Sequence, residues 1–256
     1  MAKGAALITG ASSGIGAELA KLCAAAGYRV ILVARHADAL AEIARTLPVP
    51  ARVLAADLSD PAAPRTIFDQ TRDETIDILI NNAGFGLRGA FADTDWAAES
   101  RMIQVNVSAL SELTKLFLPE MRRRGAGRIL NVASTAAFAP GPFMAIYYAT
   151  KAFVVSFSHA IASELADTGV TVTVLCPGPT PTGFQKAAGI ERSGLFQGPT
   201  MSAEGVAREG FDAMMEGRAE IIAGSRNRWM ILGTRLAPRT LLAKLTRRMN
   251  ADAPST

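Results

Sequence analysis

The stretch Ala5-Ala6-Leu7-Ile8-Thr9-Gly10-Ala11-Ser12-Ser13-Gly14-Ile15-Gly16 joins a short apolar run to a glycine-rich turn, and a helical pattern follows at once. Glycine lets the backbone turn tightly, and it lets a phosphate approach the amide groups at the start of a helix. The spacing Gly-x-x-x-Gly-x-Gly differs from Gly-x-Gly-x-x-Gly, and no Lys-Ser/Thr follows as in a Walker loop. The turn therefore predicts a phosphate-binding loop, with a tight turn that binds nothing as the alternative. Its candidate binding residues are Gly10, Ser12, Ser13, Gly14, Ile15 and Gly16.

The alternation of apolar runs and helical patterns continues along the chain. The runs predict strands at Ala5–Thr9, Arg29–Ala34, Arg52–Ala56, Ile76–Asn81, Arg128–Ala133, Val170–Cys176 and Ala219–Ala223. Between them, periodic segments predict helices at Gly14–Ala26, Ala37–Leu47, Pro61–Arg72, Asp95–Arg124, Ala145–Thr168 and Ser202–Gly217. Most runs are continuously apolar, as in parallel strands covered on both faces. The pattern predicts one α/β domain over residues 1–224, a doubly wound parallel sheet of the Rossmann type with helices on both faces.

Composition excludes several classes of protein. The chain has 256 residues, of which 49% are hydrophobic, and a net charge of only +4, so it can bury a large core and is not disordered. Its two cysteines cannot form a disulfide scaffold, and no Cys/His cluster has zinc spacing, so we expect no metal. Neither a signal-peptide core nor a run of eighteen apolar residues is present. We expect a cytoplasmic protein.

Residues 225–256 are predicted to form a basic, amphipathic helical tail. From Ile221 onward seven basic residues face one acid, a net +6, which leaves −2 for the rest of the chain. Pro238 should split the tail into two helices. The tail either packs on the domain or on a sister subunit, or it lies on an anionic membrane surface. It has no groove-reading motif, so we expect no nucleic-acid partner.

The ends of strands two to four supply candidate cofactor-binding residues, because ligands of such sheets bind beyond the carboxyl ends of the strands. Arg35 follows the second strand where an acid would hold a ribose 2′-hydroxyl, so it favours a 2′-phosphate and hence NADP(H) over NAD(H); a solvated arginine is the alternative. Asp57 and Leu58 follow the third strand, where the carboxylate could accept from adenine or cap a helix. Asn82, Ala83 and Gly84 follow the fourth, and they could contact a ribose or form a turn.

The end of the fifth strand and the next helix carry candidate catalytic residues. Tyr147 and Lys151 lie four residues apart, and therefore on one helix face. A free phenol has a pKa near ~10, and a neighbouring ammonium group favours its ionised form. Ser134, at the strand end, could orient a substrate oxygen. Taken alone, Tyr-x-x-x-Lys is a weak signal.

Together these motifs stand in order, each at a strand end: Thr9-Gly10-x-x-x-Gly14-x-Gly16, Asn81-Asn82-Ala83-Gly84, Ser134, Tyr147-x-x-x-Lys151 and Pro177-Gly178-x-x-x-Thr182. From Lys3 to Ala223 the chain resembles the short-chain dehydrogenase/reductase family in its single-domain form.

The resemblance implies roles for particular residues. Tyr147 would be the general acid in carbonyl reduction, and Lys151 would bind the nicotinamide ribose and lower the pKa of that tyrosine. Ser134 would polarise the carbonyl, and Asn106 would hold a water in a proton relay to Lys151. The cofactor would also contact the segment after the sixth strand, through Pro177, Gly178, Thr180 and Thr182. Thr180 is a mild departure, since family members often carry an apolar β-branched residue there.

The resemblance and the apolar residues suggest a substrate class. Residues 179–201 are rich in Gly and Pro and read as a lid. The lid carries Phe184, Ala187, Ala188, Ile190, Leu195, Phe196 and Met201, and around the expected pocket stand Phe85, Leu87, Phe138, Phe143 and Met144. These residues favour a hydrophobic carbonyl substrate, such as an acyl or steroid-like ketone or aldehyde, unless they only pack the lid.

The leading interpretation is an NADPH-dependent carbonyl reductase that assembles as a homodimer or homotetramer. The alternatives are an NADP(H)-binding sensor or scaffold without turnover, and an NAD-dependent alcohol dehydrogenase.

Overall fold

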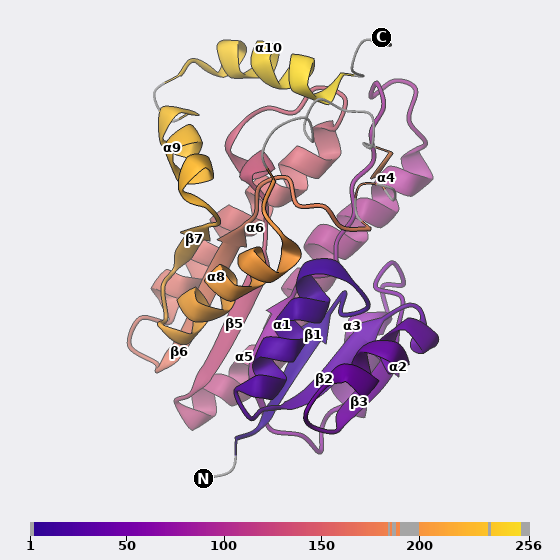
Figure 1. Ribbon diagram of the computed structural model, residues 1–256, viewed down its shortest axis with the longest axis vertical. Helices are drawn as coiled ribbons and strands as arrows, with labels where there is room; N and C mark the ends of the chain where they lie inside the picture. The colour runs from indigo at the N-terminus through magenta and orange to yellow at the C-terminus, as the bar shows by residue number, and fades with distance from the viewer. Residues whose placement is uncertain (1–2, 184, 186–187, 190–199, 235–236, 252–256) are drawn as a thin grey trace.

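A seven-stranded parallel sheet forms the centre of the molecule (Figure 1). The structure, a computed structural model, describes residues 3–183, 185, 188–189, 200–234 and 237–251. The strand order is β3-β2-β1-β4-β5-β6-β7, so the direction of the order reverses between β1 and β4. The strands are β1 (Ala5–Thr9), β2 (Arg29–Ala34), β3 (Ala51–Ala55), β4 (Ile76–Asn81), β5 (Gly127–Val132), β6 (Val170–Cys176) and β7 (Glu220–Ile222).

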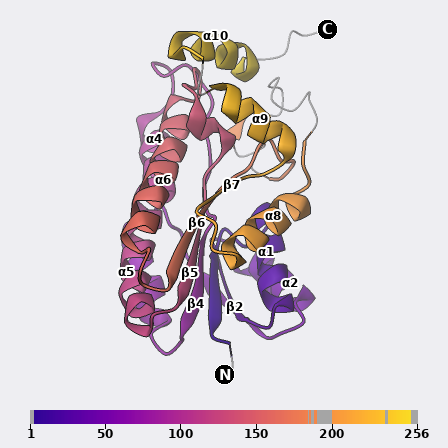
Figure 2. The same ribbon diagram turned by 90° about the vertical axis from the view of Figure 1, so that its left-hand side faces the viewer.

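Helices cover both faces of the sheet (Figure 2). One face packs against α1 (Gly14–Ala25), α2 (Ala37–Thr46) and α8 (Ala203–Met215). The other packs against α3 (Ala63–Gln70), α5 (Leu110–Arg124) and the end of α6 (Ala145–Glu164), with α4 (Trp96–Ile103) leading into α5. The predicted doubly wound parallel sheet is confirmed.

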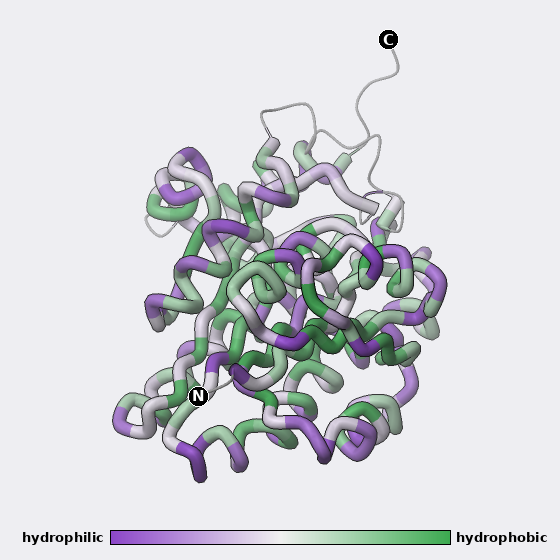
Figure 3. Tube along the Cα trace, turned by 60° about the horizontal axis from the view of Figure 1, so that its bottom comes forward, coloured by the Kyte–Doolittle hydropathy of each residue, from purple (hydrophilic) through white to green (hydrophobic). Residues whose placement is uncertain are grey.

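The two-sided burial explains why the strands are continuously apolar. All five residues of β1 are buried. Ala6 and Ile8 pack toward α1 and α8, whereas Ala5 and Leu7 pack toward α5. Figure 3 shows the hydrophobic segments gathered inside the molecule, with hydrophilic segments around the rim. Both cysteines, Cys23 and Cys176, are free and buried, as small apolar residues would be.

The strand bounds follow the sequence pattern closely. β1, β2, β4 and β6 have the predicted bounds, β3 and β5 begin and end one residue earlier, and β7 is two residues shorter. The single helix predicted at Asp95–Arg124 is wrong in one respect. A π-helical segment, η1 (Gln104–Ala109), interrupts it between α4 and α5. A short 3₁₀ helix, η2 (Thr135–Phe138), was not predicted.

A buried polar network links the sheet to the helices beneath the site. Asn81 on β4 donates from Nδ2 to Asn131 Oδ1 on β5 at 2.9 Å and to Thr114 Oγ1 on α5 at 3.1 Å. Asn131 in turn donates to Ser158 Oγ on α6 at 2.9 Å. These buried side-chain hydrogen bonds hold α5 and α6 against the central strands.

The tail forms two helices, α9 (Ser225–Thr234) and α10 (Arg239–Asn250), as Pro238 predicts. They lie at the end of the molecule opposite the N-terminus (Figure 1). Among the described residues of the tail, six large apolar side chains are exposed: Trp229, Met230, Leu232, Leu241, Leu245 and Met249. Among the described helices, none has the length and apolar character needed to cross a membrane.

Candidate active site

The ends of β1 and β4 are clamped together by hydrogen bonds. Thr9 Oγ1 accepts from the backbone amides of Asn82 and Ala83, each at 3.0 Å. The Asn82 side chain donates from Nδ2 to the carbonyls of Thr9 at 3.0 Å and Gly10 at 3.1 Å. The clamp leaves no room for a side chain on Gly16, because a Cβ there would collide with Gly10 O and Asn82 Nδ2. Gly16 therefore acts by allowing close packing and does not line the cavity.

The glycine-rich turn presents the start of α1 to the cavity. Gly10 and Gly14 have φ angles of +65° and +56°, values that favour glycine. Ser13 precedes the helix in an extended conformation, and its side chain caps no helix amide. The amides and the dipole at a helix start favour an anion, so this turn suits the pyrophosphate of a dinucleotide.

Arg35 and Asp57 line the cavity beyond the ends of β2 and β3. The Asp57 carboxylate accepts from the backbone amide of Ser59 at 2.9 Å. That hydrogen bond lowers the pKa of Asp57, and the positive charges of Arg35 and Arg101 lower it further. Asp57 thus sits ionised near two cations, one from the strand end and one from α4. It also shapes its own turn, so both interpretations of this residue stay open.

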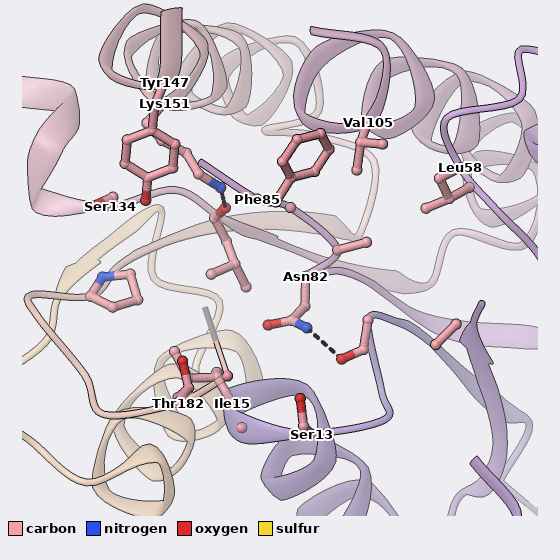
Figure 4. A pocket seen from close by; sticks show the side chains of 18 of the residues that line it. Ser13, Ile15, Leu58, Asn82, Phe85, Val105, Ser134, Tyr147, Lys151 and Thr182 are labelled. Atoms are coloured by element: carbon pink, nitrogen blue, oxygen red, sulfur yellow. Dashed lines mark hydrogen bonds between the residues drawn. The ribbon is translucent and has the colours of Figure 1, made fainter. Parts of the chain in front are cut away.

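Ser134, Tyr147 and Lys151 meet at the other end of the cavity (Figure 4). The Ser134 side chain lies beside the Tyr147 phenol and lowers the pKa of that phenol. Ser134 Oγ also accepts from the amide of Ala136 at 3.1 Å, which caps η2 and fixes the serine. Lys151 Nζ donates to the Val132 carbonyl at 2.8 Å and lies 5.9 Å from the centre of the Tyr147 ring. The spacing of four residues on α6 brings both side chains to the cavity, as predicted.

Burial shifts both titratable groups of this triad. It raises the pKa of Tyr147 to about 12, against the smaller lowering effect of the neighbouring Ser134 side chain. It lowers the pKa of Lys151 to about 8. Each shift disfavours the charged form, as desolvation does for any buried ionisable group.

Asn106 lies behind the cavity, in the π-helical segment η1, and does not line it. Its Nδ2 donates to the carbonyl of Phe85 at 3.0 Å and to Thr150 Oγ1 at 3.1 Å, and its Oδ1 accepts from the amide of Phe85 at 3.1 Å. A Cβ on Gly84 would lie 3.0 Å from Asn106 Oδ1 and 3.3 Å from Lys151 Nζ. The asparagine and the lysine therefore both lie against the backbone of Gly84. The water relay stays a prediction.

The segment after β6 crosses the cavity toward the glycine-rich turn. The Pro177 carbonyl accepts from the amide of Thr135 at 2.8 Å, and Thr180 Oγ1 donates to the Gly178 carbonyl at 3.0 Å. Thr182 reaches the turn, where a Cβ on Gly14 would lie 2.9 Å from its methyl group. In Figure 4, Thr182 lies with Ser13 and Ile15 across the pocket from Tyr147 and Ser134.

Most sequence-predicted site residues line one cavity of about 540 Å³. They are Gly10, Ser12, Ser13, Gly14, Ile15, Arg35, Asp57, Leu58, Asn82, Ala83, Gly84, Ser134, Tyr147, Lys151, Pro177, Gly178, Thr180 and Thr182. Sequence reasoning missed Arg101, Val105 and Tyr148, which also line it. The first two lie four residues apart, a spacing that places them on one helix face, but nothing in the sequence says which face meets the cavity.

The apolar residues expected around the pocket divide into two groups. Phe85 and Met144 line the cavity, whereas Leu87 and Phe143 line a separate small hollow and Phe138 packs beside Leu110 and Val154. Of the expected lid residues, Ala188 is buried against Met144, Tyr147 and Tyr148, and Met201 packs near α8. Phe184, Ala187, Ile190, Leu195 and Phe196 lie outside the described residues.

Comparison with known proteins identifies the family. The short chain dehydrogenase family profile matches residues 4–192, so the chain belongs to that family. The ketoacyl reductase HetN from Nostoc sp. is 36% identical over 177 residues, which are 67% of this chain but only 62% of HetN. Membership confirms the resemblance seen in the motifs and places the chain among oxidoreductases that act on CH–OH groups with NAD(P).

Two solved structures resemble the chain along most of its length. A short-chain dehydrogenase from Sphingobium yanoikuyae, in complex with NADPH, has a TM-score of 0.78 and 33% identity, covering 91% of this chain and 93% of that one. A bulky-bulky ketone specific alcohol dehydrogenase from Comamonas testosteroni has a TM-score of 0.78 and 30% identity, covering 92% and 93%. Both likenesses include the carboxyl-terminal part of the sheet that the family profile leaves out.

The lowered pKa of Lys151 predicts a pH dependence of stability. The ordinary pKa of 10.5 applies to the unfolded chain, so between pH 8 and 10.5 the unfolded chain binds a proton that the folded protein has lost. The free energy of unfolding should therefore rise with pH across this window, by up to about 3 kcal/mol. Lys151→Met should lack this rise. Urea denaturation of both proteins between pH 7.5 and 10 gives the difference.

The exposed Lys21 provides the matched control, and Lys21→Met should keep the rise of the wild type. Parallel pH curves for wild type and Lys151→Met would show that the buried lysine keeps its ordinary affinity for the proton.

Proposed function

We propose that this protein is an NADPH-dependent oxidoreductase that reduces a ketone or aldehyde to an alcohol. The observation that carries the proposal is the meeting of Ser134, Tyr147 and Lys151 at one end of a cavity that also reaches the glycine-rich turn. A protein that only senses a dinucleotide needs no buried proton donor at that place. The arrangement therefore favours a catalyst over a sensor or scaffold.

The residues of the chain fit NADPH, and each has a separate task. The cofactor, when bound, supplies the hydride. The backbone of the glycine-rich turn, at the start of α1, would hold its pyrophosphate beside Thr182. Ser134 would donate a hydrogen bond to the substrate oxygen, and Tyr147 would donate the proton to that oxygen. Lys151 would bind ribose hydroxyls and supply the positive charge that brings the tyrosine toward its working range.

Arg35 supports NADPH over NADH as the cofactor. It lines the cavity directly after β2, where a guanidinium group meets a 2′-phosphate, and no acid occupies the position. The Sphingobium relative in complex with NADPH agrees with this choice. An NAD-dependent alcohol dehydrogenase is the alternative, and equal affinity for the two cofactors would favour it.

We predict that Arg35→Ala removes the preference for NADPH. The dissociation constant of NADPH should rise about 10- to 100-fold, because one charge-assisted, bidentate interaction is lost, while that of NADH should change less than threefold. Titration of nicotinamide fluorescence measures both. Arg45→Ala, on the exposed side of α2, is the matched control and should bind like the wild type. Weak NADPH binding in the wild type itself would contradict the assignment.

Apolar side chains support a hydrophobic substrate. Phe85, Val105, Met144 and Tyr148 line the cavity, and the first and third were expected there from the sequence. One relative is a bulky-bulky ketone specific alcohol dehydrogenase and another, HetN, is a ketoacyl reductase, and both names agree with a ketone substrate. We propose an acyl or steroid-like ketone or aldehyde as the substrate class.

A homologous series of 2-ketones, from 2-butanone to 2-decanone, tests the substrate class. Each methylene buried in an apolar cavity contributes about 0.8 kcal/mol, so kcat/KM with NADPH should rise roughly three- to fourfold per methylene until the cavity is filled. Steady-state rates at saturating NADPH measure the slope. A flat series would contradict an apolar substrate end.

We predict that Tyr147→Phe removes turnover and keeps the cofactor. Loss of a positioned proton donor should lower kcat about 10²- to 10⁴-fold, while the dissociation constant of NADPH should change less than threefold. Tyr28→Phe, at the buried residue just before β2, is the control and should retain kcat. If Tyr147→Phe keeps full activity, another group supplies the proton. If no carbonyl in the series is reduced although NADPH binds, the sensor or scaffold interpretation gains.

The expected cytoplasmic location and the expected homodimer or homotetramer stay predictions from the sequence.

A further inference from the structure

Asn250, at the end of α10, is a fully buried amide in a helix that is otherwise mostly exposed. Its exposed fraction is 0%, and Leu242 is the other buried residue of α10. Burying an amide is unfavourable unless it makes its hydrogen bonds, so a buried asparagine near the chain end calls for specific partners. The residue was not among those that the sequence pointed out.

Asn250 bonds to three segments that lie far away in the sequence. Its Oδ1 accepts from the Tyr148 hydroxyl on α6 at 3.1 Å. Its Nδ2 donates to the Pro142 carbonyl at 2.9 Å, and its backbone carbonyl accepts from Arg88 Nε at 2.7 Å. One residue thus holds α6, the loop before α6 and the loop after β4.

Two further contacts of α10 fall on the same loop. Thr246, one turn before Asn250, donates from Oγ1 to the Pro140 carbonyl at 2.6 Å. The Arg247 guanidinium carbon lies 5.4 Å from the centre of the Phe143 ring. Residues 140–144, which we call the α6 entry loop, therefore receive three separate contacts from α10.

The α6 entry loop needs such support. Phe143 has a φ of +66°, the one positive value outside glycine among the described residues, and a left-handed conformation costs an ordinary side chain about 1 kcal/mol or more. The loop also packs closely on Tyr148, since a Cβ on Gly141 would collide with the tyrosine ring. A shift of the α6 entry loop would therefore move the Tyr148 ring as well.

Tyr148 and Met144 both line the cavity at its catalytic end. The Tyr148 ring meets the Tyr147 ring edge to face, with centroids 6.1 Å apart. Whatever displaces Tyr148 changes the wall beside the proposed proton donor, while the cofactor end of the cavity, formed by the strand ends and the glycine-rich turn, stays as it is.

We propose that Asn250 is a positioning residue for substrate binding: by bonding to Tyr148 and Pro142, it sets the wall of the cavity next to Tyr147. The inference rests on the proposed function only for the identity of the substrate, a ketone or aldehyde, that would bind against this wall. It makes α10 part of the active site of its own chain.

The test compares Asn250→Ala with Lys244→Ala, an exposed position on the same helix. With NADPH and 2-octanone, Asn250→Ala should raise KM about tenfold, with kcat within threefold and the NADPH dissociation constant within twofold of the wild type. Lys244→Ala should leave all three unchanged. Tyr148→Phe should reproduce the KM effect, and the double variant Tyr148→Phe/Asn250→Ala should add less than the two single effects together, because both remove one interaction.

Amide hydrogen exchange gives a readout that needs no substrate. In Asn250→Ala, amides of residues 141–148 should exchange at least tenfold faster, while those of β1 and α1 stay protected. If the wild type reduces no ketone or aldehyde, the proposed function fails, and faster exchange confined to residues 141–148 still supports the positioning role of Asn250. Unchanged exchange would overturn it. An unchanged KM in an active Asn250→Ala enzyme would also overturn the proposal. A loss of exchange protection throughout the protein, together with lower kcat and weaker NADPH binding, would show that Asn250 has a merely structural role.

Discussion

The fold and the site both depend on the clamp between the ends of β1 and β4. At this point the strand order reverses, so the crossover after β1 and the crossover after β4 leave toward opposite faces and open a crevice. Thr9 and Asn82 close the base of that crevice through four hydrogen bonds. Both residues take part with a backbone group and with the side chain. The close approach requires Gly16 to lack a side chain. The glycine-rich turn, predicted to bind phosphate, therefore also serves the close packing of α1 against the ends of β1 and β4.

Buried polar groups connect this crevice to α6, the helix that carries Tyr147 and Lys151. Asn81, next to the clamp, bonds to Asn131 on β5, and Asn131 bonds to Ser158 on α6, two turns beyond Lys151. Lys151 itself bonds to the last carbonyl of β5. These bonds are buried, where an unmade hydrogen bond is most unfavourable, so α6 has little freedom to slide along the sheet. The position of Tyr147 therefore follows from the sheet and from α6 together.

The local sequence pattern predicts which residues lie at the strand ends. It predicts few of the contacts that distant segments of the chain make with them. Apolar runs buried on both faces define β1, β4 and β6 to the residue. Strand ends in a parallel sheet share one edge, so the proposed cofactor-binding and catalytic residues could be placed together. The π-helical turn around Asn106 could not be predicted, because the hydrogen bonds of the Asn106 side chain go to Phe85 and Thr150, which lie far away in the sequence. Neither could Asn250, whose bond to Tyr148 spans 102 residues and leaves no periodic signal.

The electrostatics of Tyr147 and Lys151, the proposed catalytic pair, set different requirements for the two directions of the proposed reaction. With a pKa near 12, Tyr147 is protonated at neutral pH, which suits a group that must give a proton to a carbonyl oxygen. Alcohol oxidation needs the phenolate, and burial opposes it. Lys151 is the nearby cation that can offset this, yet burial also weakens its own hold on a proton, with a pKa near 8. Reduction thus uses the protonation states that burial already favours, whereas oxidation depends on the lysine staying charged beside an ionised tyrosine.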